Sequence, residues 1–323
     1  MIDKTRQTRE KLSSNQNAEL QKWRAKFNAL ANDIMTENHI DLNSVFPLSQ
    51  NQDVLLEQLS ELEKCLNSFR PFSVGHMRIL QEQYDTEYTY ESNRIEGNTL
   101  SYQETDLVVN KGMTIGGKPL KDHLEAINHQ EAITFIRSLA SDEAPFGESE
   151  LLKLHSIILQ GIDRENAGAY RSVRVRIKGS EHIFPNPVKV PELMDGYFAF
   201  YEAEKDRLHP VQLAALMHAK LVKIHPFIDG NGRTARLVMN LMLLRAGYPI
   251  TIIAAENTSR AAYYDALEKF DHDETATDFE RFIAENVRRW CLTYLDLFAS
   301  DIGADRQDKG YYFFQKLQGF IKN

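Results

Sequence analysis

Apolar residues recur at helical spacing along most of this chain, and this periodicity constrains its fold more than any other feature. Leu55, Leu56, Leu59, Leu62 and Leu66 form one such face. No repeat of constant period is visible, which argues against a solenoid. We therefore predict a mainly α fold. The expected helices cover about residues 76–97, 122–139, 148–161, 191 onward, 210–224, 233–246, 259–270 and 277–298, with two or three before residue 70 and a short one near the C-terminus.

One stretch departs from the helical pattern. Val173, Val175 and Ile177 alternate with basic residues, and the pair Gly179-Ser180 follows as a turn signal. Alternation with a period of two is typical of a strand, because successive side chains point to opposite faces. The proline-rich segment 185–187 cannot continue a helix. We predict one short β-hairpin here.

Composition and charge restrict the classes of function. The 323 residues carry 46 acidic and 38 basic side chains, a net charge of −8, whereas surfaces that bind nucleic acid are basic. The N-terminus lacks the apolar core of a secretion signal, and no apolar run approaches the roughly 18 residues that span a bilayer. Only two cysteines occur, far apart, which argues against a disulfide framework. We expect a cytoplasmic protein that binds neither nucleic acid nor membranes.

The segment His225 to Arg236, HPFIDGNGRTAR, concentrates polar chemistry at one connection between two predicted helices. A residue before proline avoids the α conformation, so the first helix should end at His225. Asp229 to Gly232 then forms a tight turn, in which glycine and asparagine tolerate positive φ and successive N–H groups converge. Such a turn feeding a helix N-terminus binds anions, most often phosphate.

The charged side chains of this segment match the parts needed for nucleotidyl transfer. Histidine titrates near neutral pH, so His225 can accept a proton from a hydroxyl. Asp229 offers the hard oxygen ligand that Mg²⁺ prefers. Arg233 and Arg236 lie three residues apart and can bind further phosphate oxygens. The segment lacks the Lys-Ser/Thr of a Walker A loop and the ligand spacing of a zinc site, which leaves a helix–turn–helix connection with capping glycines as the alternative.

The segment resembles the signature of Fic-domain proteins, HPFx[DE]GNGRxxR, with every fixed position filled. The resemblance extends from about residue 92 to about residue 286 and includes AGAYRSVRVRI and RAGYPITII. It implies an all-α core and the transfer of AMP from ATP, with Mg²⁺, to a hydroxyl side chain of a protein. In that family His225 would deprotonate the hydroxyl and Asp229 would hold Mg²⁺. The phosphates would be held by Gly230, Asn231, Gly232 and Arg233, and the γ phosphate by Arg236.

Two further regions receive roles from the same resemblance. The hairpin would be the flap that aligns the target by strand pairing, although an ordinary surface hairpin is the alternative. Tyr263 and Tyr264 match a tyrosine pair of the nucleoside pocket, with helix packing as the alternative. Asp271 stands where relatives often have asparagine, and Gly232 stands where a phosphorylating branch has lysine. The flap residues would be Lys178, Gly179, Ser180, Glu181, His182 and Ile183.

A second motif, SNRIEG at residues 92–97, resembles the inhibitory sequence [ST]xxxE[GN] of that family. Ser92 and Glu96 lie four residues apart on one helical face. A carboxylate in the last turn of a helix opposes the helix dipole, which points to a cationic partner, although a solvated glutamate is the commoner case. The resemblance implies that Glu96 pairs with Arg236 and prevents a productive ATP pose. We predict a self-inhibited enzyme that Glu96→Gly releases.

Three hypotheses remain open from the sequence. They are a protein adenylyltransferase restrained by Glu96, an enzyme that removes AMP from a modified protein, and a nucleotide-sensing adaptor. The residues after about 300 are too few for an appended winged-helix domain. Similar proteins often dimerise, so a homodimer is a further hypothesis. The expected regions are an N-terminal helical region (1–75), the inhibitory segment (76–112), the catalytic core (113–286) and a helical extension (287–323).

Overall fold

The computed structural model describes residues 40–141, 145–176, 183–273, 277–300 and 309–322, with a few isolated positions before residue 40. These residues form helices and connecting loops, and no strand occurs among them. The mainly α fold predicted from the sequence is therefore confirmed. The α-helices are α2 (Leu42–Val45), α3 (Gln52–Asn67), α4 (Val74–Ile79), α5 (Asp85–Ile95), α6 (Tyr102–Lys111), α7 (Leu120–Ser141), α8 (Glu148–Ile158), α9 (Val190–Glu204), α10 (Pro210–Ile224), α11 (Asn231–Arg245), α12 (Asn257–Asp273), α13 (Thr277–Ser300) and α14 (Tyr311–Lys322).

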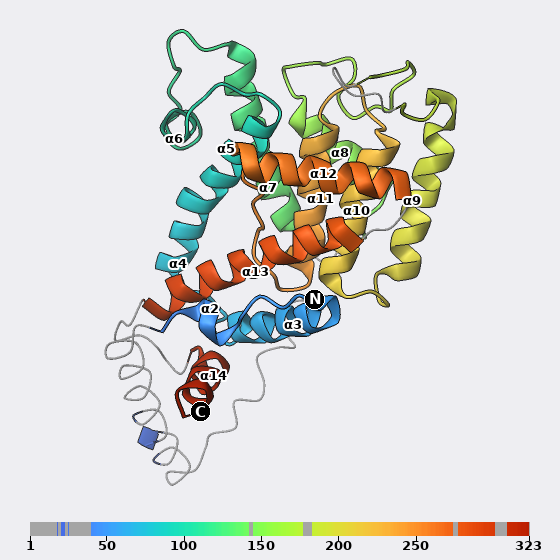
Figure 1. Ribbon diagram of the computed structural model, residues 1–323. Helices are drawn as coiled ribbons and strands as arrows, with labels where there is room; N and C mark the ends of the chain where they lie inside the picture. Colours follow the sequence, from blue (N-terminus) through green and yellow to red (C-terminus); the bar gives the residue numbers. More distant parts are fainter. Residues whose placement is uncertain are drawn as a thin grey trace, which may run out of the picture.

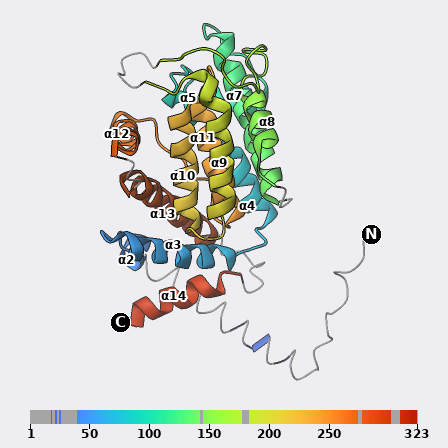
Figure 2. The same ribbon diagram turned by 90° about the vertical axis from the view of Figure 1, so that its right-hand side faces the viewer.

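Helix α11 forms the centre of the bundle. It packs against α10 along its length, with α7, α8 and α5 on its other sides (Figures 1 and 2). Helices α9, α12 and α13 surround α10. From Asn231 to Leu243 every α11 side chain except the glycine is buried, including Leu237, Val238 and Leu241. The polar side chains in the first turns of α11 are therefore enclosed by closely packed neighbours.

The two central helices begin and end where local chemistry dictates. Pro210 is the first residue of α10, where its missing N–H costs nothing, and the ring of His209 accepts the backbone N–H of Val211 at 3.2 Å. Helix α10 ends at Ile224, as predicted, and His225 follows with a φ of 50°. The connection to α11 is short, so both helix ends meet at residues 225–230.

The N-terminal helices pack against the end of the chain. Helix α3 lies along α13 and α14, at the lower edge of the bundle in Figure 1. All five leucines of its predicted apolar face are buried, and Leu55, Leu59 and Leu62 are fully enclosed. Helix α13 runs across the boundary expected between residues 286 and 287. The N-terminal and C-terminal helices are thus joined in one hydrophobic core with the central bundle.

The segment that the sequence predicts to be inhibitory, residues 76–112, is mostly helical with one local irregularity. Helix α4 continues through a π-helical turn, Leu80–Tyr84, into α5, which ends at Ile95. Helix α6 follows after a short turn and was not predicted from the sequence. Its start carries a capping box, in which Ser101 and Glu104 bond each other's backbone N–H groups.

The predicted hairpin falls largely outside the described residues. Positions 177–182, which include Lys178, Gly179, Ser180, Glu181 and His182, are not described. The described residues on either side, 171–176 and 183–186, have no strand structure, and Ile183 is exposed. A short 3-10 turn at Pro187–Lys189 leads into α9. Among the described helices, none has the length and apolar character needed to cross a membrane.

Candidate active site

The loop between α10 and α11 has an unusual backbone that the sequence explains. His225 is left-handed, with a φ of 50°, and Gly230 caps α11 with a φ of 79°. The side chain of Asn231 closes the loop, because its Oδ1 accepts the backbone N–H of Phe227 at 2.9 Å and its Nδ2 donates to the Phe227 carbonyl at 2.9 Å. Asn231 therefore shapes the loop with its side chain.

The imidazole of His225 is held from two sides. Nδ1 lies 3.3 Å from the carbonyl oxygen of Val222, and the ring stacks on Phe184 with centroids 3.9 Å apart. A proton on Nδ1 makes that contact a hydrogen bond to the carbonyl, and it leaves Nε2 with a lone pair. The arrangement suits a general base that accepts a proton at Nε2.

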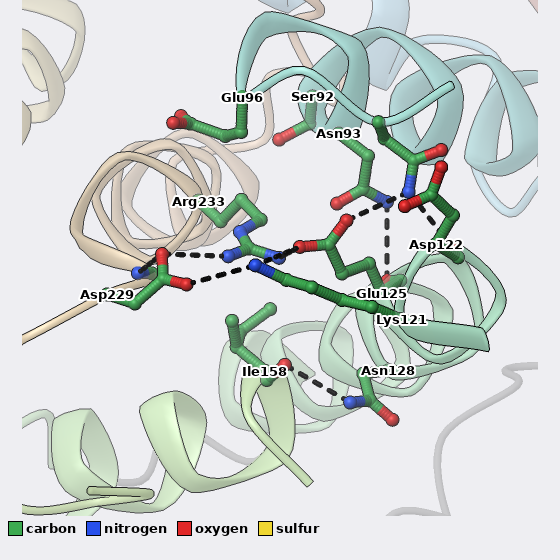
Figure 3. A network of polar contacts seen from close by, with 12 residues as sticks. Ser92, Asn93, Glu96, Lys121, Asp122, Glu125, Asn128, Ile158, Asp229 and Arg233 are labelled. Atoms are coloured by element: carbon green, nitrogen blue, oxygen red, sulfur yellow. Dashed lines mark hydrogen bonds and ion pairs between the residues drawn. The ribbon is translucent and has the colours of Figure 1, made fainter. Parts of the chain in front are cut away.

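Arg233 and Asp229 belong to a network of alternating charges (Figure 3). Arg233 Nη1 lies 2.9 Å from Glu125 Oε1, and Nη2 lies 3.2 Å from Asp229 Oδ1. Lys121 bridges the same two acids, with Nζ 3.5 Å from Asp229 Oδ2 and 3.6 Å from Glu125 Oε1. Glu125 Oε2 also accepts a hydrogen bond from Asn98, just after the predicted inhibitory motif. Helix α7, which carries Lys121 and Glu125, thus contacts both motifs.

Arg236 has a separate set of partners, most of which belong to α5 and the residue after it. Its Nε donates to Ser92 Oγ at 2.9 Å and its Nη2 to the Ser92 carbonyl at 2.9 Å. The same Nη2 lies 2.7 Å from Glu96 Oε1, with the Arg236 side chain 1% exposed and that of Glu96 32% exposed. Nη1 reaches the hydroxyl of Tyr263 at 3.5 Å. Ser92 and Glu96 therefore lie together on the α5 face that meets Arg236.

Gly232 leaves room for the Glu96 carboxylate. A Cβ built on Gly232 would collide with Glu96 Oε1 and lie 3.1 Å from Arg236 Nη1. Gly232 belongs to the first turn of α11, where backbone N–H groups attract anions. The carboxylate of Glu96 accordingly lies at the anion-attracting end of α11.

The electrostatics keep these groups charged. Burial acts to raise the pKa of Asp229, but Arg233 and the Gly230 amide outweigh it and lower that pKa below its usual value. Burial acts to lower the pKa of Arg236, and the Glu96 carboxylate raises it above its usual value. Both side chains are therefore ionised at neutral pH.

Asp229 fits a Mg²⁺ ligand by the chemistry around it. Its side chain is 45% exposed and ionised, and a cationic group, the Lys121 ammonium, already lies against Oδ2. No group of three or more metal-binding side chains occurs within the described residues. A single carboxylate suits Mg²⁺, which usually takes one or two protein carboxylates together with substrate phosphates and water.

Comparison with known proteins points to one family. The Fic/DOC family model matches residues 145–243. "Protein adenylyltransferase Fic" of Nematostella vectensis is 34% identical over 250 residues, which cover 77% of this chain and 57% of that protein. The protein of the same name from Culex quinquefasciatus is 36% identical over 241 residues, which cover 74% of this chain and 47% of that protein. The chain thus spans about half the length of the curated relatives it matches.

A solved structure decides the family. A Fic domain-containing signaling protein from Bacteroides thetaiotaomicron is 32% identical with a TM-score of 0.68, over 76% of this chain and 98% of that protein. The chain belongs to the Fic/DOC family. The structure of Fic-1 from C. elegans, 24% identical with a TM-score of 0.70 over 88% of this chain and 86% of that one, shares the fold.

His155, on α8, supports the loop between α10 and α11. This role was not predicted from the sequence. His155 Nδ1 accepts the backbone N–H of Gly168 at 3.0 Å, so the ring proton lies on Nε2, which donates to the Asp229 carbonyl at 3.0 Å. The ring stacks on Phe227 with centroids 3.6 Å apart. Burial lowers the pKa of His155 to about 4, which keeps the ring neutral. The family-like stretch around residue 168 was a signal, but only the fold brings α8 beneath the loop.

The predicted tyrosine pair of this Fic protein is split between core and surface. Tyr263 is 1% exposed, and its hydroxyl lies 3.0 Å from His218 Nε2, behind Arg236. Tyr264 is 43% exposed and lies near Arg260, whose guanidinium is 5.6 Å from the ring centroid. The nucleoside role of the pair stays a prediction, whereas the contact of Tyr263 with Arg236 is observed.

Proposed function

We propose that this chain is a protein adenylyltransferase, which transfers AMP from ATP to a serine, threonine or tyrosine hydroxyl and is restrained by Glu96. The observation that carries the proposal is the position of the Glu96 carboxylate, 2.7 Å from Arg236 Nη2 and over Gly232 at the start of α11. A helix N-terminus with a buried arginine beside it binds phosphate. A carboxylate there takes the place of a phosphate group.

The side chains divide the work of the proposed reaction. His225 Nε2 would accept the proton of the target hydroxyl as its oxygen attacks the α phosphorus. A new phosphorus–oxygen bond forms, the bond to the oxygen bridging the α and β phosphates breaks, and pyrophosphate leaves. The first-turn N–H groups of α11, with Gly230 and Gly232, would bind phosphate oxygens, and Arg236 would bind the γ phosphate.

Asp229 would hold Mg²⁺ on the phosphates, and the metal would neutralise part of their negative charge. Arg233 would act from beside it, because its guanidinium already pairs with Asp229 and Glu125. Both acids keep Arg233 in place, which fixes the first turn of α11 against α7.

Glu96 would restrain the reaction by competing for Arg236. With the carboxylate in place, the γ phosphate of ATP meets both a negative charge and an engaged arginine. The wild-type chain is therefore expected to transfer AMP slowly, and Glu96→Gly to transfer it faster.

The test is label transfer from α-³²P-ATP with Mg²⁺, onto the protein itself and onto a lysate. The variants are wild type, Glu96→Gly, and Glu96→Gly combined with His225→Ala. Label that appears with Glu96→Gly and is lost with His225→Ala supports both parts of the proposal. Absence of label in every variant, with ATP still bound in calorimetry, would contradict AMP transfer. Release of AMP from a protein labelled by Glu96→Gly, when wild type is added, would assign the reverse reaction to the same site.

A further inference from the structure

Arg171 is a buried arginine beside the candidate active site, and its hydrogen-bond partners among the described residues are all carbonyl oxygens. It follows α8 and is 3% exposed. Its backbone N–H donates to the Pro226 carbonyl at 2.9 Å. Its Nε donates to the His225 carbonyl at 2.7 Å. Its Nη1 and Nη2 donate to the carbonyls of Val173, at 3.1 Å, and Pro185, at 2.8 Å.

Burial of the charged Arg171 guanidinium in this environment costs solvation free energy. Within the described residues no carboxylate pairs with Arg171, and carbonyl dipoles alone satisfy it. Burial lowers the pKa of the guanidinium accordingly. Apolar residues of similar volume often stabilise a fold as well as buried charges do. The planar fork of arginine, which places several donors at fixed angles, is therefore the property in use here.

The three side-chain contacts join three separate segments. Val173 and Pro185 flank residues 177–182, where the sequence predicts the flap, and His225 carries the proposed base. Phe184, next to Pro185, stacks on the His225 ring. A left-handed backbone at a residue other than glycine costs about 1 kcal/mol. The bond from Nε to the His225 carbonyl helps to hold that backbone in place.

We infer that Arg171 is a positioning residue that fixes the imidazole of His225 relative to the two segments flanking the flap. The inference rests on the proposed function, because it assumes that His225 is the base. Among the described residues, Arg171 makes no hydrogen bond to Arg236 or to the first turn of α11. Its loss should therefore slow the transfer step and leave ATP binding intact. Lysine cannot replace it, since one ammonium cannot reach three carbonyls in a fixed plane.

The test compares Arg171→Lys with Arg288→Lys, both in the Glu96→Gly background. Arg288 is a matched control because it is also buried, 7% exposed, and its Nε donates to a carbonyl, that of Phe46, at 2.9 Å. Measured quantities are the rate of autoadenylylation at saturating ATP, the KM for ATP and the Tm. Misplacement of a catalytic group by about 1 Å can cost about 100-fold in rate. We expect a loss of at least about tenfold in the saturated rate for Arg171→Lys, an unchanged KM for ATP, and no such rate loss for Arg288→Lys.

The outcomes separate this inference from the proposed function. A saturated rate for Arg171→Lys equal to that of Arg288→Lys would overturn the inference alone. So would a KM for ATP that rises in step with the fall in rate, because Arg171 would then support ATP binding. No label from the Glu96→Gly parent would overturn the proposed function, and this inference with it.

Discussion

The carboxylate of Glu96 occupies the space that a Cβ on Gly232 would fill. The two residues belong to different helical segments, α5 with its C-cap and α11. An ion pair of 2.7 Å between Glu96 and Arg236 holds the carboxylate beside Gly232. The position of the Glu96 carboxylate therefore requires glycine at position 232. This relationship makes the effect of a mutation at Gly232 depend on the residue at position 96.

Gly232→Ala should lower the free energy of unfolding in wild type much more than in the Glu96→Gly background. Gly232 has an ordinary helical φ, so alanine fits the backbone, and alanine in a helix is favoured over glycine by up to about 1 kcal/mol. In wild type the new methyl would displace the Glu96 carboxylate from buried Arg236, and the loss of this charged hydrogen bond should lower the free energy of unfolding by about 1–3 kcal/mol. In Glu96→Gly there is no carboxylate to displace, and the loss should largely disappear. A double-mutant cycle of urea unfolding measures the difference, and equal losses in both backgrounds would contradict the contact.

Tyr263→Phe should destabilise the protein, whereas Tyr264→Phe should not. The Tyr263 hydroxyl is buried against His218 Nε2 and Arg236 Nη1, so its removal leaves buried polar groups without a partner. The expected loss is about 1–3 kcal/mol in the free energy of unfolding. Tyr264, half-exposed and adjacent in sequence, is the matched control. Equal effects of the two substitutions would show that the buried hydroxyl contributes nothing.

Lys121→Met should tighten the binding of a divalent cation. The Lys121 ammonium lies 3.5 Å from Asp229 Oδ2 and would compete with the proposed metal for that oxygen. The pair is partly exposed, so we expect only a few-fold change, on the order of 1 kcal/mol or less. Mn²⁺ titration followed by electron paramagnetic resonance measures the affinity without any turnover. Lys153→Met, at an exposed position on α8, is the control, and an affinity equal to that of the control would refute the competition.

Acidification below pH 6.5 should destabilise the fold through three buried histidines. Burial lowers the pKa of His155 to about 4, and it also lowers the pKa values of His129 and His218 well below the usual 6.5. Below pH 6.5 the unfolded chain takes up protons at these histidines and the folded chain does not. The stability they confer is therefore complete above pH 6.5 and is lost as the pH falls towards 4. Each contributes a slope of up to about 1.4 kcal/mol per pH unit.

Urea unfolding at several pH values between 7 and 5 checks this prediction. A free energy of unfolding that stays constant over that range would mean that the three rings take up protons in the folded state as readily as in the unfolded one.

The sequence correctly predicted helix ends that depend only on residues close by in the chain. Helix α10 begins at Pro210 and ends before His225 as expected, because a first-turn proline and a residue before proline act within one turn. Helix α6 was missed although Ser101 and Glu104 form a capping box, because only Thr105 and Val108 of its ten residues are buried and its apolar pattern is correspondingly weak. The hairpin stays a prediction, because residues 177–182 lie outside the described part of the chain.

Most contacts of the candidate site join residues far apart in sequence, so periodicity and local motifs did not predict them. Arg233 and Arg236 were expected to act together, but the first pairs with Glu125 and Asp229 and the second with Ser92 and Glu96. Ser92 and Glu96 could be named because a resemblance supplied their partner. No pattern in the sequence marks Glu125 or His155, because their contacts arise only when α7 and α8 pack against α11. Arg171 lies in the family-like stretch AGAYRSVRVRI, but nothing in that stretch indicates that its side chain bonds the carbonyl of His225.

The proposed inhibitory pair is intramolecular, and Glu96 and Arg236 are 140 positions apart in the chain. The effective concentration of the carboxylate at the arginine is therefore set by the packing of α5 on α11, and the amount of protein in solution does not enter. Dilution leaves such a restraint at full strength, whereas an inhibitor on a separate chain would dissociate. Activation must then act on the packing of α5 itself, or supply a ligand that outcompetes a tethered carboxylate.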